Sequence, residues 1–96
     1  MIIGVMKIDI LLRDIHSLKQ KRKTIKSIKQ RLSHKFNISI IESNYQDIWQ
    51  NLELSIAMLS NEKLFIEKVF NEIEDMLYSD YGLNDFRTNR DYIHES

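Results

Sequence analysis

The sequence predicts an α+β fold of two layers, in which two helices lie on one face of an antiparallel four-stranded sheet. Four stretches have apolar residues at alternate positions, as strands do, and two have them three or four positions apart, as helices do. Along the chain they follow the order βαββαβ, which right-handed connections fold into such a sandwich. The length of 96 residues suits one domain, residues 1–96.

The first predicted strand covers residues 1–13. Its alternate apolar residues form the face expected in the core: Ile2, Met6, Ile8, Ile10 and Leu12. The other face mixes apolar and charged residues, which indicates a sheet that helices cover on one side only.

The first predicted helix covers residues 17–36 and carries an apolar stripe. The stripe consists of Leu18, Ile25, Ile28, Leu32 and Phe36. Ser17 and Gln20 have the spacing of a capping box at the start of this helix. Lys21 also falls within the stripe, and we expect its stem to pack while its ammonium group stays in water.

The second and third strands are expected at residues 37–43 and 49–59, with a polar turn at residues 43–48. The buried face of the third strand is expected to be Leu52, Leu54, Ile56 and Met58. A second helix follows from Glu62 to about Ser79, with Ser60 or Asn61 as its N-cap. Its buried face is expected to be Ile66, Val69, Phe70, Ile73, Met76 and Leu77.

The last strand is expected at residues 83–93, after Gly82, which suits a backbone position with positive φ just beyond the helix. Its inward-facing residues are expected to be Phe86, Thr88 and Tyr92. The predicted strand order is 4-1-3-2, which places the two most apolar strands in the centre. This arrangement is the ferredoxin-like fold.

The charges of the chain sum to zero but are unevenly distributed. Residues 1–40 hold ten Lys or Arg and two Asp, a net charge of +8, whereas residues 41–96 hold four Lys or Arg and twelve acids, a net charge of −8. Residues 15–41 contain no acid. The first helix places five cations on one outer face: Lys19, Arg22, Lys23, Lys26 and Lys29.

This cationic face allows more than one interpretation. Lysine and arginine neutralise phosphates, so the face can bind structured RNA or a ribosomal subunit with little sequence specificity. In a lysine-rich chain it can also be a merely solvated helix face. A protein–protein interaction or homodimerisation module is the alternative function, because the two oppositely charged halves, or two half-exposed sheet faces, could pair between molecules.

The segment of residues 45–50, YQDIWQ, is a candidate second site. Tyr45 and Trp49 could stack on unpaired bases, and Gln46 could hydrogen-bond a base edge. The structural alternative is that Trp49 packs under the edge of the sheet while the Asp47 carboxylate accepts from amides of the loop.

Residue patterns of enzyme chemistry are missing from the sequence. The chain has no cysteine and two glycines, which excludes a thiol nucleophile and a glycine-rich phosphate loop. The three histidines are scattered, and spacing pairs no carboxylates. We therefore expect no catalytic residue, cofactor or metal. The absence of a long apolar run and of a signal-peptide pattern leads us to expect a cytoplasmic protein without membrane contact.

Three stretches resemble a known family in the order in which it has them: SLKQKR at residues 17–22, FNISIIE at residues 36–42 and YQDIWQ at residues 45–50. The chain resembles the YlxP-like family of small uncharacterised bacterial proteins from Met1 to about Phe70. The resemblance implies the ferredoxin-like fold and no established reaction. In some bacteria the genes of that family lie near those of translation initiation and ribosome maturation factors, so we expect a non-catalytic RNA- or ribosome-associated module.

Overall fold

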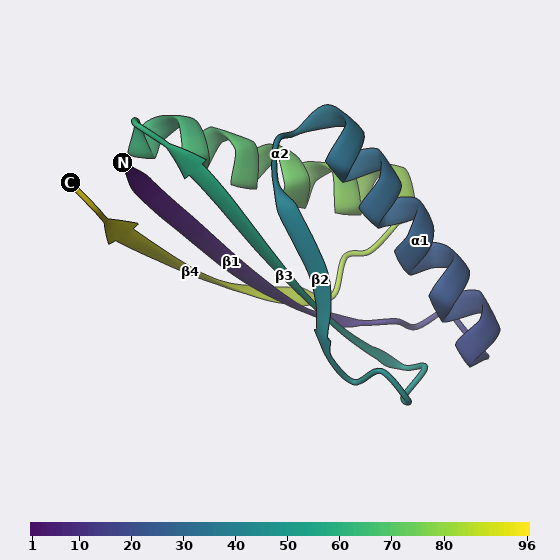
Figure 1. The fold of residues 1–96 in the computed structure, drawn as a ribbon. Helices are drawn as coiled ribbons and strands as arrows, with labels where there is room; N and C mark the ends of the chain where they lie inside the picture. The colour runs from purple at the N-terminus through teal and green to yellow at the C-terminus, as the bar shows by residue number, and fades with distance from the viewer.

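The computed structural model describes all 96 residues and has the predicted order of elements (Figure 1). The elements are β1 (Ile2–Leu11), α1 (Leu18–Lys35), β2 (Ser39–Asn44), β3 (Asn51–Ser60), α2 (Lys63–Tyr81) and β4 (Phe86–His94). The four strands form one antiparallel sheet in the order β2-β3-β1-β4, with both helices on one face. The predicted ferredoxin-like fold and the strand order 4-1-3-2 are therefore confirmed.

The core lies between the sheet and the two helices. Alternate residues of β1 and β3 point into it in register, so that Ile8 lies opposite Leu54 and Met6 opposite Ile56. Gly4 of β1 faces α2 at a point of close approach. A Cβ atom there would overlap the Ile66 side chain and lie 3.2 Å from the Phe70 ring. The absence of a side chain at Gly4 therefore lets α2 pack directly on the central strand.

The ends of the helices follow the predicted chemistry in part. The Ser17 hydroxyl accepts a hydrogen bond from the Gln20 amide at 3.1 Å, which is one half of the predicted capping box. The Gln20 side chain accepts from the His16 amide at 2.8 Å and not from the Ser17 amide, so the reciprocal half is displaced by one residue. At the other helix the N-cap is Glu62, so the prediction of Ser60 or Asn61 was wrong by one or two residues. Ser60 instead accepts from the Glu62 amide at 3.1 Å, which fixes the turn that precedes the helix. Gly82 has the expected positive φ, 63°.

Strand β4 differs from its predicted pattern. Thr88 lies on the helix-facing side of the sheet, as predicted, yet it is exposed because little covers this edge strand. Phe86 and Tyr92 are partly buried against the core, and so is Arg90, whose guanidinium pairs with Glu74 of α2 and donates to Asn71 at 2.9 Å. The ion pair between Arg90 and Glu74 lets a charged side chain occupy the helix-facing side of this edge strand.

The molecule is elongated, with principal extents of 45 × 23 × 21 Å. One face of the sheet is left uncovered by the helices (Figure 1). The chain ends meet at one pole, where the Met1 and Glu95 backbones form two hydrogen bonds of 2.8 Å. The start of α1 and the turn of residues 45–50 lie at the opposite pole. Neither helix is apolar over a length that would cross a bilayer.

Candidate nucleic-acid interface

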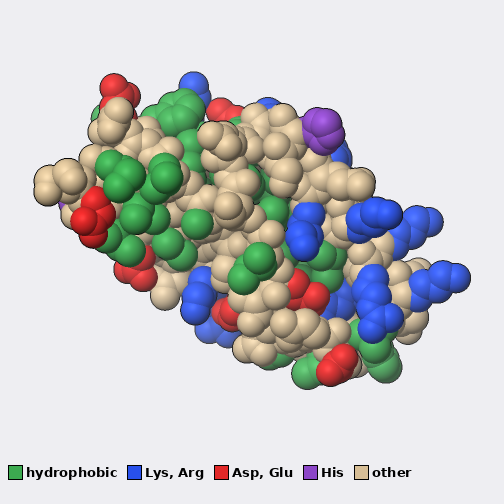
Figure 2. All heavy atoms as spheres, in the orientation of Figure 1, with side chains coloured by type: hydrophobic (Ala, Val, Ile, Leu, Met, Phe, Trp, Pro, Cys, Tyr) green, Lys and Arg blue, Asp and Glu red, His purple; other side chains and the backbone are tan.

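The five cations predicted on the first helix lie together along the outer side of α1. Figure 2 shows Lys and Arg side chains grouped over this helix. Four of the five are exposed and Lys29 is half-buried. None takes part in an ion pair. We call this group the cationic face: Lys19, Arg22, Lys23, Lys26 and Lys29.

The cations of the cationic face lack acidic partners because of the surroundings and the composition of α1. Its inward stripe covers the sheet, and the helix itself contains no acid that could pair along its own surface. Some cations elsewhere have partners: Arg31 lies 2.8 Å from Asp80 of α2, and Lys63 lies 3.9 Å from Glu67. The acidic half of the chain therefore neutralises Arg31 at the helix interface and leaves the outer face of α1 with its full charge.

A shallow groove runs beside the cationic face, between α1 and the edge strand β2. Its volume is about 360 Å³. Three cations and one acid line it, namely Arg22, Lys26, Lys29 and Glu42, together with Ile25 and Gln30. The floor is thus positive on the helix side, where an anionic group could be held between side chains.

Lys21 departs from its prediction. We expected its ammonium to stay in water, but the side chain is only 1% exposed. Its Nζ donates to the backbone carbonyls of Tyr45 at 2.5 Å and Ile48 at 2.7 Å. Glu42 Oε2 lies 3.0 Å away as the ion-pair partner and accepts no hydrogen bond from any group. The turn of residues 45–50 supplies the acceptors that allow the ammonium to be buried.

The second predicted site is a compact turn with exposed side chains. Tyr45 has a positive φ of 65°, and its carbonyl also accepts from the Ile48 amide at 3.1 Å. Trp49 is 40% exposed, so its side chain is only partly covered. Gln46 makes a long 3.4 Å contact with the Glu42 carbonyl. The exposed Asp47 side chain makes no hydrogen bond, which removes the structural role considered for it.

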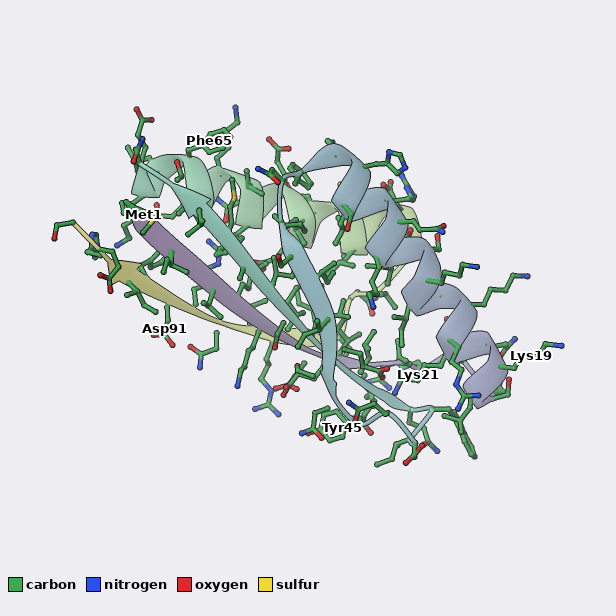
Figure 3. The ribbon with its side chains drawn as sticks, in the orientation of Figure 1. Met1, Lys19, Lys21, Tyr45, Phe65 and Asp91 are labelled. Atoms are coloured by element: carbon green, nitrogen blue, oxygen red, sulfur yellow. The ribbon has the colours of Figure 1, made fainter.

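The structure brings the two predicted sites together. Figure 3 shows Lys21, Lys19 and Tyr45 at the same pole of the molecule, on α1 and on the turn. The link is Lys21 itself, since the hydrogen bonds from its Nζ fix the turn against the first part of the helix. Sequence reasoning missed this link; the position of Lys21 inside the apolar stripe of α1 was the one available signal.

Two carboxylates also meet on the uncovered face of the sheet. Asp9 of β1 lies opposite Glu53 of β3, and the Ser43 hydroxyl donates to Glu53 Oε1 at 2.6 Å. Partial loss of hydration, followed by repulsion from Glu53 and hydrogen bonding to it, raises the pKa of Asp9 above its ordinary value. Arg87 and Lys7 oppose this rise. The sequence did not pair these carboxylates, because they are 44 positions apart and meet only through strand register.

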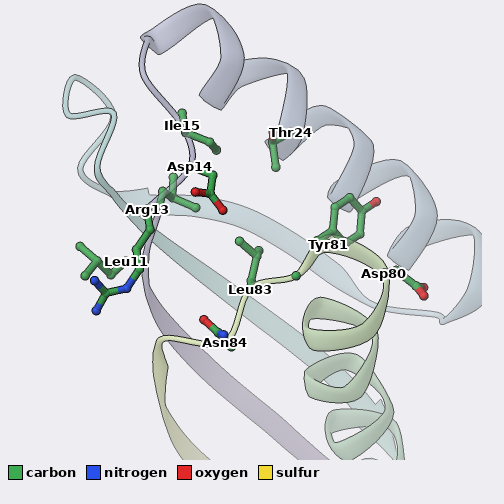
Figure 4. Close-up of a pocket in the computed structure, with 11 residues that line it drawn as sticks. Leu11, Arg13, Asp14, Ile15, Thr24, Asp80, Tyr81, Leu83 and Asn84 are labelled. Atoms are coloured by element: carbon green, nitrogen blue, oxygen red, sulfur yellow. The ribbon is translucent and has the colours of Figure 1, made fainter.

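A further pocket lies where the end of β1, the start of α1 and the end of α2 converge (Figure 4). Its volume is about 470 Å³. Asp14, Asp80 and Arg13 lie on its wall with Tyr81, whose hydroxyl is 2.8 Å from that of Ser27 on α1. No group of three or more His, Asp or Glu side chains in the structure is placed to hold a metal ion.

A small ferredoxin-like α+β protein with an unpaired cationic helix face is the class that these features define. The chain belongs to the family described as a protein of unknown function, DUF503, which it matches over residues 3–90. It is also 38% identical over 71 residues to the uncharacterised protein YlxP of Bacillus subtilis (strain 168), covering 74% of this chain and 77% of that protein. The predicted YlxP-like resemblance is confirmed.

Solved structures agree with the fold. A de novo designed protein with a ferredoxin fold has a TM-score of 0.56 at 15% identity, covering 99% of this chain and 88% of that one. A dimeric ferredoxin-like protein from an uncultured marine organism has a TM-score of 0.51 at 14% identity, covering 99% of this chain and 95% of that one. At these identities the likeness concerns the fold alone.

Proposed function

We propose that this protein is a non-catalytic binding module that docks on structured RNA, such as that of a ribosomal subunit, through the cationic face of α1. The observation that carries the proposal is the set of five cations without an ion-pair partner on one side of one helix. Phosphates are the natural counter-charges for such a set, because each contact releases condensed counterions from the nucleic acid.

The dimensions of the face fit this partner. Lys19 and Lys29 are separated by ten residues of helix, or about 15 Å along its axis. A nucleic-acid duplex presents several phosphates over that length. Backbone contacts of this kind position a protein without reading sequence, so shape and not base order would decide which RNA is bound.

The test is a charge-reversed variant in which Arg22, Lys23 and Lys26 become Glu. We expect the wild type to co-sediment with ribosomal particles at low salt and to bind a structured RNA with a steep salt dependence, while the variant does neither. The matched control reverses Lys7, Lys68 and Arg87, three exposed cations without an ion pair, which changes the net charge equally on β1, α2 and β4. Unchanged RNA affinity in the first variant, with circular dichroism showing both folded, would refute the proposal.

A second candidate function, self-association, is favoured by one observation. Leu59, Ile3 and Ile93 form an apolar row across the uncovered face of the sheet, and Leu59 is 61% exposed. Figure 2 shows hydrophobic side chains gathered at the pole where the two chain ends meet. The marine ferredoxin-like protein is described as dimeric. A dimer through this row should persist in high salt and dissociate in Leu59→Lys, as measured by light scattering; a monomer in all conditions would exclude it.

A further inference from the structure

The turn of residues 45–50 is fixed to the helix that carries the cationic face. Lys21 precedes Arg22 and Lys23 in α1, and its Nζ bonds to the carbonyls of Tyr45 and Ile48. Because this side chain is 1% exposed, it is placed to hold the turn and not to touch a ligand. The position of the turn relative to the cationic face is therefore set by the interior of the protein.

The turn presents apolar and aromatic surface beside those cations. Trp49 is 40% exposed and Ile48 is 44% exposed, and Figure 2 shows hydrophobic side chains adjoining the Lys and Arg group at this pole. Tyr45 holds a left-handed backbone conformation, which is uncommon for a non-glycine residue. That conformation accompanies the hydrogen bonds from Lys21 and from the Ile48 amide to its carbonyl.

Asp47, near the tip of the turn, limits what can pass over it. Its side chain is exposed and is not neutralised by any ion pair. A regular duplex that continued from the cationic face across this tip would bring phosphates against the carboxylate. An unpaired base offers an uncharged ring face instead, and aromatic side chains stack on such faces without regard to sequence.

From this arrangement, and resting on the proposed RNA-binding function, we infer that the protein recognises a junction at which an RNA duplex ends in an unpaired nucleotide. The duplex phosphates lie along the cationic face, and the unpaired base stacks on Trp49 of the turn. Lys21 is a positioning residue, which places the stacking surface at the end of the row of cations.

The test compares three hairpin RNAs that share one stem, whose strands are joined by a non-nucleotide linker so that the loop offers no unpaired base: a blunt hairpin, the same hairpin with unpaired nucleotides at the 3′ end, and an otherwise identical one whose extension is abasic. A parallel set carries the extension at the 5′ end. We expect the base-bearing extension to bind roughly tenfold more tightly than the blunt stem, within the range for one stacked base. The abasic extension keeps the added phosphates and should lose most of that gain.

Trp49, the only tryptophan, reports the contact directly. Its fluorescence should be quenched by the base-bearing extension and little affected by the blunt stem. Trp49→Leu should remove the tenfold preference and leave affinity for the blunt stem unchanged. Lys21→Met, if folded by circular dichroism, should also lose the preference and the quenching while keeping the blunt-stem affinity and its salt dependence.

The outcomes separate the two proposals. Equal affinity for blunt and extended hairpins, with unquenched Trp49, overturns the junction inference and leaves the binding of RNA by the cationic face intact. An abasic extension that binds as tightly as the base-bearing one also overturns it, because the gain then comes from phosphates. Failure of every hairpin to bind overturns the proposed function and the inference with it.

Discussion

The ammonium group of Lys21, on α1, donates to the backbone carbonyl of Ile48 at 2.7 Å, across 27 positions of sequence. Together with the hydrogen bond from the same ammonium group to the Tyr45 carbonyl, it joins the two surface regions that the sequence singled out separately. It also explains how a lysine occupies the apolar stripe of a helix, since backbone carbonyls and the Glu42 carboxylate replace the water that its charge would otherwise require.

Replacing Lys21 by Met should destabilise the protein by about 3 kcal/mol, as expected when one partner of a buried ion pair is removed. The variant keeps the apolar stem and leaves Glu42 and two carbonyls without their cation. Urea denaturation followed by circular dichroism measures the change. A loss below about 1 kcal/mol would contradict a structural role for the buried ammonium.

The double variant Lys21→Met/Glu42→Gln supplies the control for that result. It removes the uncompensated carboxylate as well, so its free energy of unfolding should exceed that of Lys21→Met alone. Strict additivity of the two single changes would show that the two charges do not interact.

Asp9→Asn should stabilise the protein at neutral pH, and the gain should disappear in acid. The raised pKa of Asp9 means that the folded state binds more protons than the unfolded state at pH values above the ordinary aspartate pKa. The contribution of the Asp9 carboxyl to stability is therefore complete below the ordinary aspartate pKa. It is lost as the pH rises through the pKa that Asp9 has in the folded protein. Urea denaturation at about pH 4 and pH 7 tests whether Asp9→Asn raises the free energy of unfolding at neutral pH and not in acid. Asp91→Asn, on the same sheet face, controls for net charge.

Gly4→Ala should destabilise the protein by roughly 1–3 kcal/mol through overpacking. The added methyl group would overlap Ile66 and crowd the Phe70 ring, which forces α2 away from β1. Combining Gly4→Ala with Ile66→Val should recover part of the loss if the clash is local. Wild-type stability for Gly4→Ala in urea denaturation would mean that the helix and sheet are less closely packed than described.

Lys26→Ala should weaken RNA binding by a similar factor for different RNA sequences and lower the slope of log affinity against log salt by about one. The reason is that, under the proposed function, an exposed lysine on the cationic face would contact phosphate and not a base edge. Fluorescence anisotropy with two unrelated hairpins measures both quantities. Lys68→Ala, an exposed lysine on α2, should change neither; a sequence-dependent effect of Lys26→Ala would point to base readout.

The element order and most of the core could be predicted because they depend on local periodicity. The inward faces predicted for the first and third strands include Ile8 and Leu54, which the structure buries completely. The alternating pattern did not predict which residues of the last strand are covered. Thr88 lies at an edge where little covers it, and Arg90 is held inward by Glu74, a partner 16 positions away. Such long-range pairing leaves no signal in the local pattern.

The sequence by itself determined the ferredoxin-like fold, the family and the cationic face, because alternation, helical spacing and the lack of acids in residues 15–41 act over neighbouring residues. Only the tertiary structure decided that Lys21 is buried, that Asp9 faces Glu53, and that the turn of residues 45–50 adjoins the cations. The hydration of a charge depends on the groups that surround it in space. For these residues, those groups come from distant parts of the chain.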